Sequence, residues 1–196
     1  MSTENNALGY SGTNAGGDLI IMNSIWRHNM AGIVPNTLES EKLAPQDGTR
    51  IVNNRIYSNH NERAPTKALQ YPSFGNGIVV AGGINNVIAG NLIWDHPNHR
   101  ILIVPHLDEQ LWIPAGHTVR HNTVWASGRA DLALAAPAGS GTCFAGNRFF
   151  RRRPGGIEEL YGCGSPLTRL GAGTRCPWSS RPGCSGPPAG GSSRPT

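Results

Sequence analysis

The stretch Ile88-Ala89-Gly90-Asn91-Leu92-Ile93-Trp94 decides the fold of this chain, because its pattern occurs four more times. The pattern consists of an apolar residue, two variable residues, an asparagine, a variable residue, an apolar residue and an aromatic residue. The other copies are Ile20–Trp26, Ile51–Tyr57, Val119–Trp125 and Phe144–Phe150. A short unit repeated in this way predicts a stacked, quasi-one-dimensional fold.

The spacing of a second motif gives the length of one unit. Gly32-Ile33-Val34 and Gly77-Ile78-Val79 follow the asparagine motif, and 23 residues separate Ile78 from the equivalent Ile101. A 23-residue unit of three short apolar runs is typical of one coil of a β-helix rather than of a helical hairpin. Alternation of apolar and polar positions predicts which side chains point inward: Ile20, Ile25 and Ile33 inward, Ser24 and Val34 outward.

The repeated asparagine has a physical reason to recur. An amide side chain at a tight corner can lie inside the coil and bond to the backbone, and stacked coils then bring the amides together as a ladder. Replacing one amide with an apolar residue would leave its partners unpaired, at a cost of roughly 1–3 kcal/mol. Solvent-exposed turn asparagines are the alternative interpretation. The predicted ladder consists of Asn23, Asn54, Asn91, Asn122 and Asn147.

With these repeats, residues 5–150 resemble the right-handed parallel β-helices of the pectate-lyase-like superfamily, in particular uncharacterised secreted actinobacterial β-helix proteins. The segments Gly9–Gly17 and Gly32–Thr37 carry the resemblance to the actinobacterial proteins. The resemblance implies an all-β solenoid. It leaves the function open, because lyases, hydrolases, epimerases and inert surface proteins share this fold.

The charge distribution divides the chain into two regions. Residues 1–150 hold ten basic and ten acidic residues, whereas residues 151–196 hold seven Arg and two Glu, so the whole net charge of +5 lies in the second region. We therefore expect no nucleic-acid partner for the repeat region. Residues 151–196 are rich in Gly, Pro and Ser and show no apolar period, which predicts a disordered tail or an out-of-frame product.

Both ends of the repeat region are abrupt. Residues 5–11 read as the last third of a coil, which predicts that earlier coils are missing, and no closing coil or cap is expected after Phe150. We expect neither a signal peptide nor an apolar span of membrane length in these residues. The resemblance implies that a full-length relative is extracellular or in the cell envelope. The sequence says nothing about the oligomeric state.

The four cysteines suggest no metal site. Cys163, Cys176 and Cys184 have spacings that match no zinc pattern. Cys143 precedes the inward Phe144, so we interpret it chiefly as a small core residue rather than a reactive one; in a full-length exported relative, a disulfide to a coil absent here is the alternative.

Insertions between coils mark the place where function is expected. The loops Asn36–Gly48 and His106–Gly116 each add eight residues on one edge of the Gly-Ile-Val strands, and Asn61–Asn76 adds fourteen on the other edge. These loops predict a shallow groove over that strand face. Its floor would be Val34, Val79, Leu102 and Ala133, and its second wall would carry Arg63 and Lys67.

The acidic groove residues are the candidates for catalysis. Hydrolysis needs two carboxyl groups, and β-elimination needs a base and a positive group beside the uronate. The catalytic candidates are Glu39, Glu41, Asp108, Glu109, Asp131 and Arg100, and Asp47 also lies on the first wall. Solvated loop charge is the alternative interpretation. The apolar floor argues against a complete catalytic site. No cofactor is expected, although the resemblance allows Ca²⁺.

Two further groups of residues are binding candidates. Asp95, His96 and His99 are close enough in sequence to suggest a metal site, with polar turn residues as the more ordinary interpretation. One aromatic residue per coil points outward by alternation, and such rings can stack on sugars or on each other. The candidate glycan-binding residues are Trp26, Tyr57, Trp94, Trp125 and, from the loop, Trp112; Phe150 continues the stripe.

These observations predict a β-helix of the bacterial envelope or exterior that binds or processes a polysaccharide, such as a cell-wall glycan, in the groove. The alternatives are a structural or adhesive β-helix and an inactive gene fragment. The residues do not decide whether the chain is an enzyme.

Overall fold

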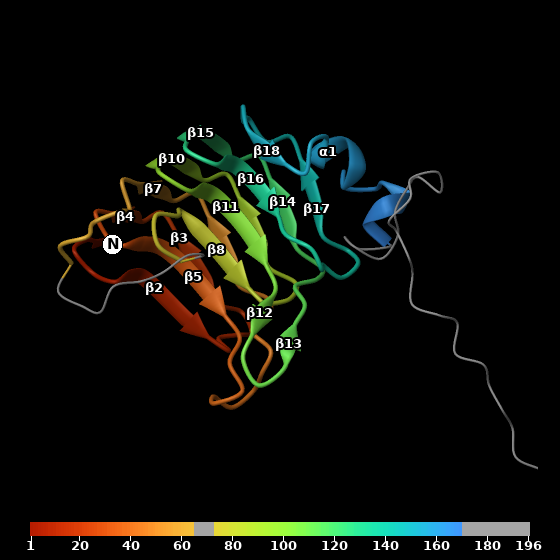
Figure 1. Cartoon of the computed structure of the whole chain (residues 1–196), viewed down its shortest axis with the longest axis horizontal. Helices are drawn as coiled ribbons and strands as arrows, with labels where there is room; N and C mark the ends of the chain where they lie inside the picture. Colours follow the sequence, from red (N-terminus) through yellow and green to blue (C-terminus); the bar gives the residue numbers. More distant parts are fainter. Residues whose placement is uncertain (65–72, 170–196) are drawn as a thin grey trace, which may run out of the picture.

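The computed structural model describes residues 1–64 and 73–169. Most of its strands form three parallel sheets that run the length of the molecule (Figure 1). Sheet A contains, in order, β1 (Ser2–Thr3), β4 (Ile25–Arg27), β7 (Arg55–Tyr57), β10 (Leu92–His96) and β15 (Thr123–Ser127). Sheet B contains β2 (Leu8–Thr13), β5 (Ala31–Asn36), β8 (Ile78–Ala81), β11 (His99–Val104), β16 (Ala130–Leu134) and β18 (Arg152–Arg153). Sheet C contains β3 (Ile20–Met22), β6 (Arg50–Val52), β9 (Val87–Ala89), β14 (Thr118–Arg120) and β17 (Cys143–Ala145).

The chain visits the sheets in the order A, B, C and then returns to A one strand further along. Residue numbers therefore increase steadily along the stack, from red to blue in Figure 1. This arrangement confirms the all-β class and the stacked parallel strands, and it is compatible with a β-helix. No helix in residues 1–64 and 73–169 is long and apolar enough to cross a membrane.

The interior is filled by columns of apolar residues, one column from sheet A, one from sheet C and two from sheet B. Ile33, Ile78, Ile101 and Leu132 are fully buried in sheet B and lie opposite one another in the register of neighbouring strands. Ile56, Ile93 and Val124 do the same in sheet A. Burial of such side chains contributes roughly 1.5–3 kcal/mol each, so the stacked columns stabilise the fold.

The first motif is shifted by one residue relative to the others. Ile21 pairs with Ile51 and Trp26 pairs with Ile56, so Trp26 occupies the inward position and is 1% exposed. Ile20 is 46% exposed and Ser24 is buried. The expected inward positions of Ile20 and Ile25, and the outward position of Ser24, are therefore wrong, whereas Ile33 is inward as predicted.

The asparagine ladder is present, with one change of membership. Asn54, Asn91 and Asn122 each donate both the backbone N–H and the Nδ2 to the Oδ1 of the next asparagine, at 2.9–3.1 Å, and Asn147 ends the series. Their Nδ2 atoms also donate to backbone oxygens of sheet C, as Asn91 does to Ile51 at 2.9 Å. Each of these three amides therefore donates both to the next asparagine and to a backbone oxygen of sheet C.

Asn23 is not part of the ladder. It is an exposed corner residue with φ 51°, and Ser24 takes the ladder position because of the one-residue shift. Asn54 Oδ1 accepts the Ser24 backbone N–H and the Trp26 indole N–H, both at 3.2 Å. Trp26 Nε1 therefore replaces the missing amide donor.

Two further polar columns line the other corners of the coil. Between sheets A and B, Asn6 donates to Asn29, Asn29 to Asn59, and Asn59 Nδ2 contacts His96 Nε2 at 3.2 Å. Between sheets B and C, the column consists of Gln46, Asn86, His117 and Thr142. All three turns between sheets therefore have an internal polar column.

The segment that follows Phe150 closes one end of the stack. Ile157 of α1 (Ile157–Leu160) is fully buried and extends the apolar core, and the short 3₁₀-helix η1 (Pro166–Arg169) follows. Glu158 Oε1 accepts both ladder donors of Asn147, at 2.9 and 2.7 Å. A disulfide joins Cys143 to Cys163. The expected end without a cap, and the interpretation of Cys143 as a simple core residue, are wrong for this part of the chain.

The remainder of the predicted tail, residues 170–196, lies outside the described residues, as do Cys176 and Cys184. The boundary of the predicted tail at residue 151 therefore falls inside a folded segment.

Candidate functional site

The outer face of sheet B carries the predicted groove floor. Val34, Val79, Leu102 and Ala133 form one apolar cluster, but each is only 1–4% exposed. The floor is therefore apolar, as expected, yet the side chains above β5 and β8 offer almost no surface. Lys67, expected on one wall, lies outside the described residues, and Arg63 is exposed.

An open hollow of about 340 Å³ lies over β11 and β16 on this face. Leu102, Ala133 and Leu134 contribute its apolar side. His99, Arg129 and Arg153 contribute its polar side, and both arginines are exposed. The hollow therefore combines an apolar surface with two positive charges, a composition that suits an anionic ligand with a flat apolar face.

The protonation state of His99 follows from this environment. Burial lowers the pKa of His99 to about 4, and the positive charges of Arg129, Arg153 and Arg100 act in the same direction. His99 is therefore neutral at pH 7, and its Nδ1 lies 3.1 Å from Asn76 Oδ1. The positive potential of the hollow at pH 7 comes from the arginines.

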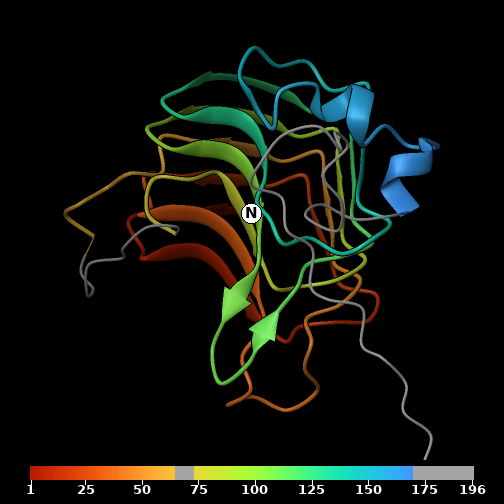
Figure 2. The ribbon, with the colours of Figure 1, turned by 45° about the vertical axis from the view of Figure 1, so that its right-hand side comes forward.

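The two predicted loops lie side by side and form a lobe beyond the sheets. The second loop contains the hairpin β12 (His106–Leu107) and β13 (Leu111–Trp112), which protrudes at the bottom of Figure 2 beside the orange loop after β5. Glu39 joins the loops: its carboxylate accepts the Trp112 indole N–H at 2.5 Å and the backbone N–H groups of Glu109 and Gln110 at 3.2 and 3.0 Å. Its own N–H donates to Asp108 Oδ2 at 3.1 Å.

These contacts give Glu39 a structural role. Desolvation acts to raise the pKa of Glu39, but hydrogen bonds with Asp108, Gln110 and Trp112 lower it more strongly, so the net pKa is below its usual value. A carboxylate held ionised by several donors is a poor general acid. Glu41 and Glu109 are exposed, and no carboxylate of the described residues lines the hollow over the apolar floor.

The catalytic candidates Arg100 and Asp131 lie inside the coil rather than in the groove. Both are buried, at 0% and 1% exposed. Arg100 Nε donates to the Trp125 carbonyl at 2.8 Å, and Nη1 donates to the His96 carbonyl. Asp131 Oδ2 accepts the backbone N–H groups of Phe150 and Arg151 at 2.9 and 3.0 Å. Burial lowers the pKa of Arg100 to about 10, which leaves it charged at pH 7.

A geometric reason for this placement lies in the neighbouring coil. Gly77 precedes Arg100 in the same column, and a Cβ there would come within 2.6 Å of both the Arg100 carbonyl oxygen and Ile93. The interior of the corner therefore has no room for a side chain at Gly77. One coil later, the Arg100 side chain occupies the equivalent corner and lies beside His96, the last member of the Asn6–His96 column.

The predicted metal residues are separated by the fold. Asp95 is exposed and accepts the Ser58 hydroxyl at 2.6 Å, His96 is inside the coil, and His99 lines the sheet B hollow. Burial, with the charges of Arg100 and His60, holds the pKa of His96 well below its usual value. Among residues 1–64 and 73–169 no group of three or more His, Cys, Asp or Glu side chains could hold a metal ion. The described side chains therefore do not fit the Ca²⁺ that the resemblance allows.

The predicted aromatic stripe is shorter than expected, and its rings stack on one another. Trp26 is internal, and Trp112 belongs to the lobe. Tyr57 and Trp94 have ring centroids 4.3 Å apart, and Trp94 and Trp125 have centroids 5.3 Å apart, with nearly parallel planes. Since each inner face is covered by a neighbouring ring, a glycan cannot stack along the column, which agrees with mutual stacking as the alternative interpretation.

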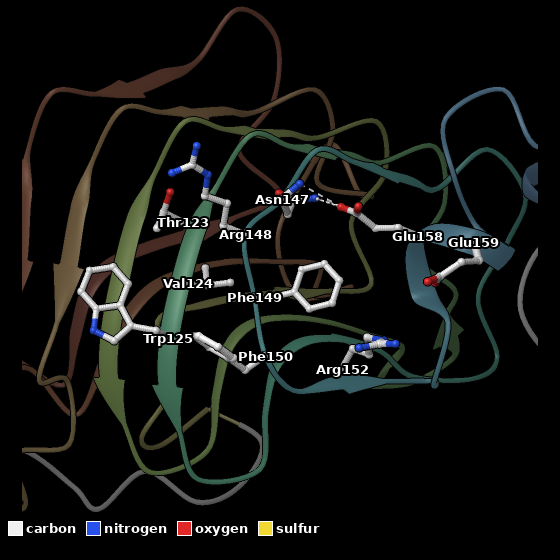
Figure 3. Close-up of a pocket in the computed structure, with 10 residues that line it drawn as sticks. All are labelled: Thr123, Val124, Trp125, Asn147, Arg148, Phe149, Phe150, Arg152, Glu158 and Glu159. Atoms are coloured by element: carbon white, nitrogen blue, oxygen red, sulfur yellow. Dashed lines mark hydrogen bonds between the residues drawn. The ribbon is translucent and has the colours of Figure 1, made fainter.

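A second open hollow, of about 560 Å³, begins at the end of this stack (Figure 3). Trp125, Phe149 and Phe150 line it together with Arg152 and Glu159. The sequence motif identified Trp125 and Phe150 as stripe members but did not indicate a hollow between coil and cap. Neither Arg129 nor Arg153 was identified from sequence; Arg153 lies opposite Ala133 in the register of neighbouring strands, so no repeated charge links the two arginines.

No protein-family model, curated protein or solved structure matches the chain. The fold and the site geometry therefore carry the functional argument alone.

Proposed function

We propose that the protein is a right-handed parallel β-helix of the pectate-lyase-like type that binds an acidic polysaccharide on the outer face of sheet B. The observation that carries the proposal is the hollow where Arg129 and Arg153 stand beside Leu102 and Ala133. A uronate unit has a carboxylate for the guanidinium groups and a C–H face for the apolar side chains. The repeat pattern and the A–B–C winding support the fold assignment.

Binding rather than cleavage is the proposed activity. Glu39 is held in the loop clasp, and Arg100 and Asp131 are bonded inside the coil, so these candidates are committed to structure. The polar atoms that the hollow presents are cationic or neutral. Such a site attracts the carboxylate but lacks the two carboxyl groups that a hydrolase places about 5–10 Å apart.

An exported location is part of the proposal. The Cys143–Cys163 disulfide ties the cap to the last strand of sheet C. Disulfides persist in oxidising compartments outside the cytosol, which supports a place in the cell envelope or exterior, where a polysaccharide ligand would be met.

Affinity electrophoresis through gels containing polygalacturonate tests this function. The unmodified chain should be retarded, and retardation should weaken as salt increases, since screening shortens the range of charge attraction. The double variant Arg129→Ala with Arg153→Ala should lose at least about tenfold in affinity, equivalent to about 1.4 kcal/mol. A matched control removes two exposed arginines from other sheets, Arg55→Ala with Arg120→Ala.

Equal retardation of the two double variants would contradict the proposal, as would absence of retardation of the unmodified chain. Incubation with the same polymer, followed by measurement of unsaturated and reducing-end products, should show no cleavage. Product formation would instead require a catalytic site.

A structural or adhesive role is the second candidate. It is favoured by the protruding lobe, on which Leu43, Leu107, Leu111 and Ile113 are 44–88% exposed. An apolar protrusion of this kind suits attachment to another macromolecule. Loss of attachment in Leu107→Ala with Leu111→Ala, but not in the arginine variants, would favour this role.

A further inference from the structure

The hollow at the end of the aromatic stack lies between β15 of sheet A and the segment that caps the stack, and its lining shares no residue with the hollow over sheet B. Tyr57, Trp94 and Trp125 occupy equivalent positions in successive coils. Neighbouring strands in a sheet are about 4.8 Å apart, and ring spacings of 4.3 and 5.3 Å match this repeat. The coil repeat therefore defines where a fourth ring of the stack would lie.

Phe150 is the residue that the chain supplies for this fourth position. Thr123 bridges to Arg148, and the Val124 N–H donates to the Arg148 carbonyl at 2.9 Å, so Phe150 stands opposite Trp125 in the next coil. Its side chain is nevertheless 82% exposed. Among the described residues, Trp125 stacks one face of its ring on Trp94. The hollow is on the cap side of Trp125.

The remaining walls are polar and balanced in charge. Arg152 has its guanidinium carbon 5.6 Å from the centre of the Phe149 ring, and Glu159 is exposed on α1. Figure 3 shows Phe149 and Arg152 between the stack and the cap, with Glu159 on the helix beyond them. Arg148 and Glu158 also line the hollow, so its walls carry two arginines and two glutamates. A cation is disfavoured because Arg152 already covers Phe149, and an anion is disfavoured by the two glutamates.

We propose that this hollow is a sugar site, in which one neutral pyranose unit of a glycan stacks its C–H face on Trp125 as the next member of the ring column. Its hydroxyl groups reach Glu159 and the arginines, and Phe150 borders the open side. A pyranose combines a flat apolar face with a rim of hydroxyls, the combination that an indole face beside an acceptor and donors recognises. The volume of about 560 Å³ accommodates a ring with part of its neighbour.

Tryptophan fluorescence titration with cellohexaose, xylohexaose, mannohexaose and maltohexaose tests the site. At least one of these should shift the emission, with a dissociation constant of about 1 mM or below, as expected for one stacked ring with a few hydrogen bonds. Trp125→Ala should weaken binding at least about tenfold, and Phe150→Ala and Glu159→Gln about threefold each. Leu107→Ala, which truncates an exposed apolar side chain on the lobe, should leave binding unchanged.

Trp125→Ala also removes a stacking partner of Trp94, so its folding must be checked by circular dichroism. Phe150→Ala and Glu159→Gln alter exposed side chains and keep the test decisive if Trp125→Ala fails to fold. No spectral change with any of the four sugars at about 10 mM would overturn the proposal. Binding that is unaffected by both Phe150→Ala and Glu159→Gln would also overturn it.

The Arg129→Ala with Arg153→Ala variant separates this site from the groove. It should retain neutral-sugar binding while losing polygalacturonate binding. Loss of both in that variant would contradict a separate site and place the sugar on sheet B.

Discussion

The two ends of the asparagine ladder are completed by different chemistry. Every ladder amide donates toward the C-terminal end, so the last member, Asn147, has two donors that need an acceptor, and Glu158 supplies it. The first member, Asn54, instead has an acceptor that needs donors, and the Trp26 indole and the Ser24 N–H supply them. A ladder of identical amides thus has a direction, and its ends require opposite partners.

The interior of the ladder is where disruption should cost most. Asn122→Leu leaves the backbone N–H and the Nδ2 of Asn91 without their acceptor and removes the bond to Ile88. Two unpaired donors at roughly 2 kcal/mol each give a loss of about 4 kcal/mol in unfolding free energy, which urea denaturation measures. A loss below about 1 kcal/mol would mean that solvent reaches the corner.

The capped end should depend on its covalent tie. Cys143→Ser with Cys163→Ser opens a link between residues 20 positions apart. Chain entropy predicts a loss of about 3 kcal/mol, and reduction of the unmodified protein should lower stability equally. An unchanged thermal midpoint under reducing conditions would show that Ile157 and Glu158 hold the cap without the disulfide.

The polar column between sheets B and C differs from the asparagine ladder because it contains a titratable residue, His117. Burial lowers the pKa of His117 to about 4, although a backbone hydrogen bond with Gly83 acts in the opposite direction. The ring is therefore neutral at pH 7, and its Nδ1 accepts the Asn86 N–H. Between about pH 6.5 and pH 4 the unfolded chain binds the extra proton, so stability falls as pH falls through this window. The resulting loss of unfolding free energy reaches about 3 kcal/mol near pH 4.

The non-titrating variant His117→Gln serves as the control for this pH dependence. Denaturant unfolding between pH 7 and pH 4 should show a shallower loss of stability in His117→Gln than in the unmodified protein. Parallel curves would exclude His117 as the source, and would leave His96 and His99, whose pKa values are also lowered by burial.

The stabilising effect of Glu158 can be separated into the effect of its charge and the effect of its hydrogen bonds. Glu158→Leu removes the acceptor of two half-buried donors and should cost about 2 kcal/mol, whereas Glu158→Gln keeps a carbonyl oxygen and should cost less than about 1 kcal/mol. Equal losses in both variants would show that the ionised carboxylate, rather than an acceptor atom, is required.

The Trp26 end should show the smallest effect. Trp26→Phe keeps an inward ring but removes one of the two donors to Asn54 Oδ1, while the Ser24 N–H remains. The expected loss is about 1 kcal/mol, against no change for Trp94→Phe on the outer face, compared by urea denaturation. A larger loss at Trp26 than at Glu158 would reverse the order of the two ends.

Much of the fold was predictable because one motif carries both a side-chain direction and a hydrogen-bonding role. Asn54, Asn91, Asn122 and Asn147 were identified from spacing alone and form the ladder. Asn23 was assigned wrongly because Ser24 and Trp26 together imitate the motif one residue later. The column between sheets B and C was missed, since Gln46, Asn86, His117 and Thr142 share a role without sharing a residue type. The column between sheets A and B was also missed, although three of its members are asparagines.

The candidate site was less predictable than the fold. The pairing of loops Asn36–Gly48 and His106–Gly116 followed from insertion lengths, but the use of Glu39 as their clasp depends on side-chain geometry. Arg100 and Asp131 alternate with core residues and so read as groove residues; a bend at the corner turns them inward. Asp95, His96 and His99 are neighbours in sequence, yet three different environments hold them.

By itself, the sequence determined the all-β class, the coil length, most of the ladder and the apolar character of the sheet B face. These properties are local and repeat with every coil, so one period reveals them. The tertiary structure alone decided which charged residues are buried, how the last coil is closed, and where two hollows open. Such properties arise where the repeat is broken, at insertions and ends, and there the partners come from distant parts of the chain.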